Sequence, residues 1–259
     1  MSTTPGTNPS TTPGTARQPP SASAPVSLTE RRKAETRTEI ARAAAALFVR
    51  QGLRATRAED IAQAAGIAPR TFYRYFATKE EAVAPLYGAG AQRWTEAVRS
   101  APAHLGVPEA LEHAVRHTLT PGAGVSAASW EWVRTLIRLA DASPALRKVW
   151  AEVCQASEQT LAEILANRIA STGAYGHGEH DGRDGRRGGR DNVAPEPIPP
   201  APVTPDLRFA AAVAGAAVRV AVESWAATSS PPTGPEGPAS LALRNLASLR
   251  DFCWGNDGD

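Results

Sequence analysis

The chain has 259 residues, enough for one large domain or two modest ones with a buried core. Hydrophobic residues make up 42% and charged residues 21%, as in an ordinary globular protein, and the formal net charge is +2. Two cysteines without CxxC spacing, Cys154 and Cys253, are too few for a disulfide framework. The sequence has no 18-residue apolar run that would predict a membrane span, and its polar N-terminal segment lacks the apolar core of a secretory signal. We therefore expect a cytoplasmic protein without membrane contact.

The first part of the chain is more basic than the rest. From Glu30 to Glu81 there are eleven Lys or Arg against seven Asp or Glu, whereas residues 82–259 hold sixteen against nineteen. This distribution favours contact of the front segment with phosphates. The basic cluster at residues 31–33 is either an arm that lies on DNA or a solvated helix start.

Three stretches rich in Pro, Gly, Ser and Thr divide the chain. Residues 1–28 are predicted to be a disordered tail, residues 172–205 a disordered insert, and residues 229–238 a shorter break. Between them we expect two domains, one over residues 29–94 and a second over residues 95–259 that contains the insert.

The remaining segments are rich in alanine, with apolar residues three and four positions apart, which predicts an all-α protein. In chain order, we expect helices over residues 30–51, 57–64, 69–76, 79–99, 108–119, 127–141, 144–170, 206–227 and 239–253. Pro85 inside the fourth of them predicts a kink or a late start, and a possible pivot.

Residues 37–87 carry the most specific pattern. Gly52 is placed to end the first helix in a left-handed conformation. Thr56 and Glu59 have the spacing of a capping box, which would open the short second helix. After a tight turn at Ala65 and Gly66, Pro69 suits the first position of a third helix.

The third helix has two different faces. Phe72 and Phe76 are expected to pack inward with Ile61 and Ile67, whereas Arg70, Tyr73 and Arg74 lie on the other side. A short helix with a basic and aromatic outer face, braced by a second helix across a turn, suits insertion into the major groove of DNA. Two ordinary short helices at the edge of a bundle are the alternative interpretation.

The run from Asp60 to Glu81, which contains TFYRYFATKEE, resembles the DNA-binding signature of the tetracycline-repressor (TetR) family. This resemblance implies an N-terminal three-helix helix-turn-helix domain, followed by a C-terminal helical bundle for ligand binding and dimerisation. It also implies that Arg70, Thr71 and Tyr75 approach bases. The residues that it implies in phosphate contacts are Thr56, Arg57, Tyr73 and Lys79.

Two positions depart from the family pattern. Ala68 stands where the family usually has a serine, so that one phosphate contact is expected to be lost, and Pro69 offers little to a base edge. Arg70 is therefore expected to dominate base recognition, because a guanidinium can donate two hydrogen bonds to guanine.

The C-terminal half carries no phosphate loop, nucleophile motif or HExxH, so that we expect neither an enzyme nor a cofactor. Glu109, His113 and His117 share one helical stripe, which is either a metal site or a polar exposed face, and we assign no metal.

Large aromatic residues are the candidate ligand contacts. Trp94, Trp130 and Trp150 either line an apolar pocket or fill the core. Arg134 and Arg138, one helical turn apart, either meet an anionic headgroup or face water. Arg219 lies in an otherwise apolar helix and pairs with Glu223, with a pocket anion, or with a residue across a dimer.

The order of the later segments is similar to a branch of the TetR family that senses acyl-CoA-like ligands, which includes the mycofactocin-associated regulators. This similarity implies a hydrophobic or acyl-CoA-like effector and a homodimer formed by residues 206–227 and 239–253. The expected function is a repressor that binds a palindromic operator in double-stranded DNA and leaves it when the effector binds.

Two other functions remain open. The body could be only a dimer scaffold for a ligand-independent or activating DNA-binding protein, or an enzyme could carry a DNA-binding module.

Overall fold

A computed structural model describes residues 27–122, 127–176 and 201–249 of the chain. Most of the predicted tail and most of the predicted insert lie outside these residues. The first helix begins at Leu28, inside the predicted tail, and the last helix ends at Ala247 instead of residue 253. Within the described part there are helices and no strand, as predicted. The elements are α1 (Leu28–Gln51), α2 (Ala58–Ala64), α3 (Pro69–Tyr75), a 3₁₀ helix η1 (Glu81–Val83), α4 (Ala84–Arg99), α5 (Val107–Leu119), α6 (Ala127–Ala142), α7 (Pro144–Gly176), α8 (Pro205–Ala227) and α9 (Pro238–Ala247).

Capping residues and prolines fix many of the helix starts. The Ser27 hydroxyl accepts a hydrogen bond from the Glu30 amide at 3.2 Å, and Thr204 caps α8 in the same way through Leu207. Proline occupies the first turn of α3, α4, α5, α8 and α9, where its missing N–H costs nothing. Pro85 therefore marks a late start of α4 after η1, one of the two outcomes predicted for it.

Helices extend into both ends of the insert that was predicted over residues 172–205. Helix α7 continues to Gly176 instead of ending at residue 170, and α8 begins at Pro205. Adding a residue to an existing helix costs far less than starting one, so that α7 extends six residues past its predicted end at residue 170.

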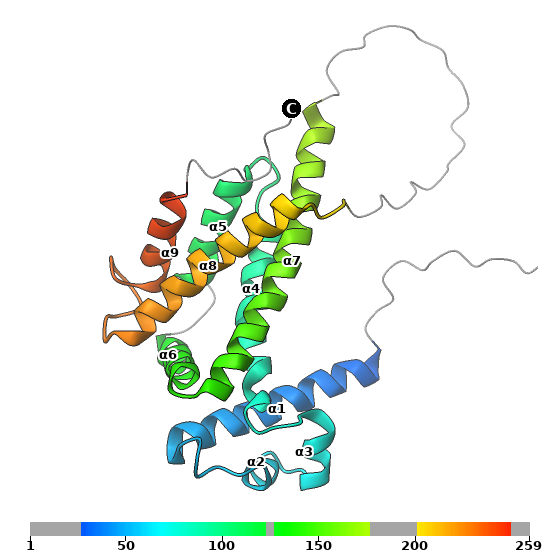
Figure 1. Ribbon diagram of the computed structural model, residues 1–259, viewed down its shortest axis with the longest axis vertical. Helices are drawn as coiled ribbons and strands as arrows, with labels where there is room; N and C mark the ends of the chain where they lie inside the picture. The colour runs from blue at the N-terminus through cyan, green and yellow to red at the C-terminus, as the bar shows by residue number, and fades with distance from the viewer. Residues whose placement is uncertain (1–26, 123–126, 177–200, 250–259) are drawn as a thin grey trace, which may run out of the picture.

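Helices α1, α2 and α3 form a compact head at one end of the molecule, and α4 leads from it into the body (Figure 1). The head is centred on the buried side chains of Ile40, Phe48, Ile61 and Phe72. The same core includes Leu136 and Leu146 from α6 and α7. Head and body therefore share one continuous apolar core instead of meeting through a polar linker.

The body packs α4, α5, α7, α8 and α9 around a second core that contains Val98, Leu111, Leu165 and Ala214. Helix α8 crosses the long α7 (Figure 1) and is apolar and long enough, by length and composition alone, to span a membrane. Its buried residues pack into this core and, near its C-terminal end, into a smaller cluster with Trp130 and Ile137 of α6, and it carries Arg219 and Glu223. These features are typical of a core helix.

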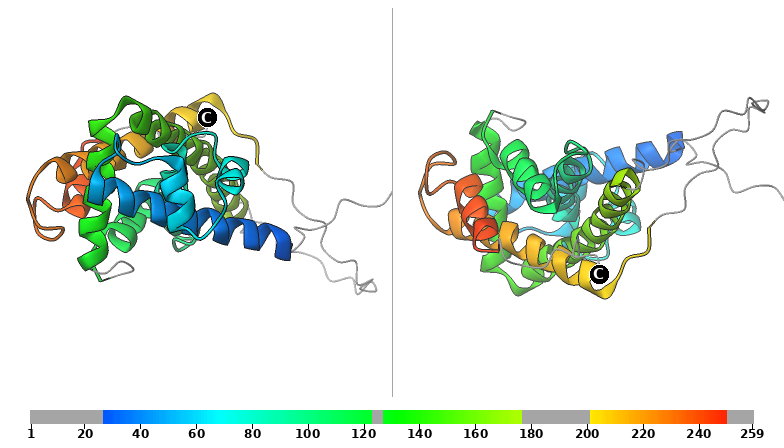
Figure 2. Two further views of the ribbon diagram at one scale, coloured as in Figure 1. Left: turned by 90° about the horizontal axis from the view of Figure 1, so that it is seen from below. Right: turned by 90° about the horizontal axis from the view of Figure 1, so that it is seen from above.

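The first turns of α1 lie apart from the rest of the fold. Both views in Figure 2 show this end of α1 projecting beyond the head, and residues 27–35 are all exposed. The basic cluster at residues 31–33 lies on this projecting end. Within it, Lys33 forms an exposed ion pair with Glu30 at 3.0 Å.

Candidate nucleic-acid interface and ligand cavity

Helix α2 begins one residue later than predicted, and a different pair of residues caps it. The Asp60 carboxylate accepts a hydrogen bond from the Arg57 amide at 2.8 Å. The Thr56 hydroxyl instead donates to the Gly52 carbonyl at 2.8 Å, and Thr56 is fully buried. The predicted Thr56–Glu59 capping box is therefore wrong, because the Thr56 hydroxyl bonds to the carbonyl of Gly52 at the end of α1. This placement buries the Thr56 side chain, for which the resemblance implies a phosphate contact.

The turn between α2 and α3 is built on Gly66, which has a φ of +69°. The amide of Ile67 donates to the Ala62 carbonyl at 2.9 Å, and the amide of Gly66 donates to the Gln63 carbonyl at 3.1 Å. These are the bonds of a glycine-terminated helix end. They direct the chain sharply into α3 at Pro69, so that α3 crosses α2 in the head (Figure 1).

The two faces of α3 are separated as predicted. Phe72 and Phe76 are buried, with ring centroids 5.8 Å apart, and they pack with Ile61 and Ile67. The outer face is solvent-accessible, and its exposed residues are Ala68, Pro69, Arg70, Tyr73 and Arg74. An exposed basic and aromatic face on a buried apolar one is the arrangement that a groove-reading helix needs.

Tyr73 connects the outer faces of the two short helices. It is 53% exposed, and its hydroxyl donates to the Glu59 carboxylate at 3.4 Å. The pKa of Tyr73 is raised, first by desolvation and then by the charge of Glu59. Neighbouring Thr71 and Tyr75 are half-buried, and the Arg74 guanidinium lies 5.6 Å from the Tyr75 ring centre.

Lys79 fixes the loop before α2. Its ammonium donates to the carbonyls of Leu53 at 2.7 Å and Thr56 at 2.8 Å. The predicted phosphate role would use the third ammonium hydrogen, since two are engaged. Arg57, next to this loop, is exposed.

A cavity of about 170 Å³ lies in the body between α4, α6, α7 and α8. Aromatic side chains form much of its wall, namely Tyr87, Trp94, Trp130 and Trp150. Its polar lining includes Arg93, Thr118, Cys154, Ser157, Glu158 and Arg219. Four of the six predicted ligand contacts therefore line the cavity: Trp94, Trp130, Trp150 and Arg219.

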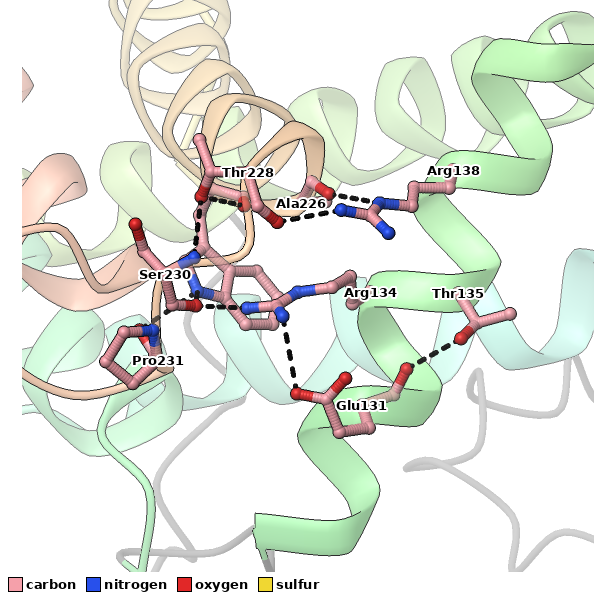
Figure 3. Close-up of polar contacts among 9 residues, drawn as sticks. Glu131, Arg134, Thr135, Arg138, Ala226, Thr228, Ser230 and Pro231 are labelled. Atoms are coloured by element: carbon pink, nitrogen blue, oxygen red, sulfur yellow. Dashed lines mark hydrogen bonds and ion pairs between the residues drawn. The ribbon is translucent and has the colours of Figure 1, made fainter.

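The other two predicted ligand contacts, Arg134 and Arg138, lie outside this lining. Figure 3 shows both guanidinium groups reaching from α6 to the C-terminal end of α8. Arg138 donates to the carbonyls of Ala226 at 2.6 Å and Thr228 at 2.8 Å. Such carbonyls have no partner within their own helix, which is why they attract these cations.

Arg134 is buried in this contact. Its guanidinium lies 4.3 Å from the centre of the Trp225 ring, donates to the Ser230 carbonyl and pairs with Glu131 at 3.4 Å (Figure 3). We conclude that the two arginines fasten α6 to the end of α8. The sequence did not indicate this contact, because the accepting carbonyls lie some ninety residues further along the chain.

Arg219 pairs with Glu223 at 3.4 Å, one of the three alternatives considered for it. The second oxygen of Glu223 accepts a hydrogen bond from the Trp150 indole at 2.7 Å. Trp150 packs edge-on against Tyr87, with centroids 5.1 Å apart. A continuous set of contacts therefore joins α8, α7 and α4 along one wall of the cavity.

Among the cavity residues that the sequence did not indicate are Tyr87, Cys154 and Glu158. Burial raises the pKa of the Cys154 thiol to about 12, and it raises the pKa of Glu158 against the opposing effect of Arg219. Tyr87 is buried and lines the same cavity. Cys154 and Glu158 are four residues apart on α7 and therefore share one helical face, which is the sequence signal that could have placed them together.

The predicted polar stripe on α5 places the rings of His113 and His117 parallel, with centroids 6.4 Å apart. Within the described residues no group of three or more His, Cys, Asp or Glu side chains has the geometry of a metal site.

Comparison with known proteins agrees with the geometry of the head. Residues 40–84 match the family model described as bacterial regulatory proteins, tetR family. The transcriptional regulator TcmR of Streptomyces glaucescens is 30% identical over 143 residues, which are 54% of this chain and 63% of that protein. The transcriptional repressor KstR2 of Mycobacterium tuberculosis is 50% identical over 50 residues, which are 19% of this chain and 25% of that protein. The match thus spans less than two thirds of either relative.

One solved structure with a similar arrangement of helices is Thermus thermophilus FadR, a TetR family transcriptional repressor, in complex with lauroyl-CoA. The alignment covers 82% of this chain and 92% of that one, with a TM-score of 0.45 and 22% identity. We draw no functional conclusion from a similarity of this size. Residues 40–84 therefore resemble the DNA-binding domain of TetR family regulators, and the two relatives that this chain matches are regulators of transcription.

Proposed function

We propose that this protein is a transcriptional repressor that binds a palindromic DNA operator as a homodimer and leaves it when a hydrophobic effector fills the cavity. The observation that carries the proposal is the outer face of α3. Arg70, Tyr73 and Arg74 are exposed there, while Phe72 fixes the helix from behind. Such a helix can enter the major groove, with Arg70 at a base edge.

Phosphate contacts would surround this face. Arg57 is exposed at the start of α2, where the helix amides also favour anions, and Lys79 keeps one ammonium hydrogen for a phosphate. We leave Thr56 out of this set because its hydroxyl is buried. Thr71 and Tyr75 remain candidates for base contact at the edges of the face.

The exposed apolar surface of helix α8 supports the proposed homodimer. The helix exposes Phe209 at 62% and Val220 at 45%, and the half-buried Val213 and Ala216 lie between them at helical spacing. An apolar stripe of this kind suits a copy of itself related by a twofold axis. The same axis would place two α3 helices about one DNA turn apart and so require an inverted repeat.

The cavity supports release by an effector. Tyr87 and Leu136 line it and also belong to the core of the head. A molecule that moves these side chains would move α4 relative to α1, and with it the spacing of the two α3 helices. A coupling free energy of about 1–3 kcal/mol would suffice to empty the operator. An acyl-CoA-like effector would place its acyl chain here.

The proposal is tested by footprinting the DNA upstream of the protein's own gene and of its neighbours with the full-length protein. We expect one protected site with inverted symmetry, and loss of protection when the effector is added. A screen of acyl-CoAs, fatty acids and hydrophobic drugs by thermal shift identifies that effector. Protection that no compound in the screen relieves would favour the alternative of a dimer scaffold without a sensor.

A further inference from the structure

The wall of the cavity contains a carboxylate without a direct partner. Glu158 lines the cavity from α7 and is half-buried. Among the described residues, no hydrogen bond or ion pair to its side chain is found, although Arg219 lies near enough to affect its pKa. A partly desolvated carboxylate in such a place is costly unless a donor or a cation meets it.

The neighbouring helix is shaped around this side chain. Gly215 lies opposite Glu158 in the middle of α8, where glycine weakens a helix relative to alanine. A Cβ atom at this position would be 2.9 Å from Cγ of Glu158. Glycine therefore leaves the space in which the Glu158 side chain lies between the two helices.

The other charged groups of this wall are either paired with each other or exposed to solvent. Arg219 pairs with one oxygen of Glu223, and Trp150 donates to the other. Arg93 is exposed, and its Nε donates to the Ala89 carbonyl within its own helix. An anionic group beside Glu158 would thus face a carboxylate, while the Arg219 guanidinium already pairs with Glu223.

The remaining surface favours an aromatic or apolar molecule of modest size. Trp94, Trp130 and Trp150 contribute large ring surfaces, and aromatic faces also attract cations. An enclosed volume of about 150 Å³ is known to admit benzene, so that about 170 Å³ suits one ring with a short chain.

We propose that the buried end of the effector carries a protonated amine, which binds the Glu158 carboxylate while its ring or alkyl part packs on the tryptophans. This inference rests on the proposed function and names the class of effector that the cavity selects. A carboxylate or phosphate is excluded from the same position by the charge of Glu158.

Three probes of matched length test the proposal by calorimetry on the full-length protein: 3-phenylpropylammonium, 3-phenylpropanol and 3-phenylpropanoate. The ammonium probe should bind about tenfold more tightly than the alcohol, which is the value of one charge-assisted hydrogen bond, and the carboxylate should bind most weakly. The Glu158→Gln variant should lose this preference for the ammonium probe. Glu163→Gln, an exposed glutamate of α7 outside the cavity lining, is the matched control and should keep it.

Gly215→Ala provides a second variant in which the charge is retained. The added methyl group displaces Glu158, so that the preference for the ammonium probe should fall as it does in Glu158→Gln. The inference is overturned if the carboxylate probe binds as tightly as the ammonium probe, if none of the three binds, or if Glu158→Gln behaves like Glu163→Gln. Operator binding without effector is measured in parallel: if it is intact and an acyl-CoA relieves it, the proposed function stands and only the amine inference fails.

Discussion

The hydroxyl of Tyr87 donates a hydrogen bond to the main-chain carbonyl of Leu136 at 2.9 Å. This bond joins α4, the helix that follows the head, to α6 in the body. Both side chains are buried in the core of the head and also line the cavity. A molecule that filled the cavity would therefore touch both residues of the contact that joins α4 to α6.

Tyr87→Phe removes this hydrogen bond and keeps the ring. We expect the free energy of unfolding to fall by about 1 kcal/mol, the usual value of a buried hydrogen bond. Release of the operator by effector should also need a higher effector concentration. Urea unfolding and an operator-release titration measure the two effects. Tyr73→Phe, whose hydroxyl is exposed, is the control and should leave unfolding almost unchanged.

Arg70→Ala should weaken operator binding and relax the preference at one base pair in each half-site. One bidentate contact to guanine is worth about 1–3 kcal/mol of discrimination. Fluorescence anisotropy with a set of single-base operator variants measures this preference. Arg116→Ala, an exposed arginine of α5 in the body, should leave both affinity and preference as in the wild type. Equal behaviour of the two variants would remove Arg70 from base recognition.

Pro85→Ala tests whether the start of α4 acts as a pivot. Proline leaves η1 and α4 as separate helices, whereas alanine allows the α-helix to continue back through residues 81–83. We expect a stiffer junction and weaker release of the operator by effector, at unchanged operator affinity in its absence. If effector affinity and effector-driven release both match the wild type, the pivot hypothesis fails.

Arg134→Met should destabilise the body more than Arg138→Ala does. Arg134 is buried, stacks on Trp225 and binds the carbonyl of Ser230, whereas Arg138 is exposed. We expect a loss of about 2 kcal/mol for the first variant and about 1 kcal/mol for the second. Chemical denaturation of both, at equal protein concentration, gives the comparison. A smaller loss of unfolding free energy for Arg134→Met than for Arg138→Ala would contradict the conclusion that Arg134 contributes more than Arg138 to the contact between α6 and α8.

Glu158→Gln should be more stable than the wild type at neutral pH. Burial raises the pKa of Glu158 in the folded protein, so that ionising it costs stability as the pH rises above the ordinary glutamic acid value of about 4.3. Below that value both states are protonated, and the advantage of the variant should vanish. Unfolding midpoints measured between about pH 4 and pH 7 test this, and a constant difference across the range would argue against it.

Local signals account for most of what the sequence predicted correctly. Proline at helix starts, glycine at Gly52 and Gly66, and the spacing of Phe72 and Phe76 each act within a few residues. These features suffice to define the helices and the two faces of α3. The predicted cap of α2 was one residue too early. The Thr56 hydroxyl could accept from the Glu59 amide or donate to the Gly52 carbonyl, and in the folded protein it donates to Gly52.

Contacts between distant segments account for what was missed. Arg134 and Arg138 have the spacing of a ligand-binding pair, but only the folded chain brings the end of α8 to them. The importance of Gly215 likewise depends on Glu158, which lies on another helix. Residues 172–176 are helical because they extend α7, and extending a helix costs less than starting one.

The most direct test of the central claim is selection of binding sites from random double-stranded DNA by the full-length protein. We predict enrichment of an inverted repeat whose half-sites lie about one helical turn apart, with one conserved base pair per half-site that is lost when Arg70→Ala is used. Recovery of no common sequence, or of the same sequence with the same preference by Arg70→Ala, would contradict the account.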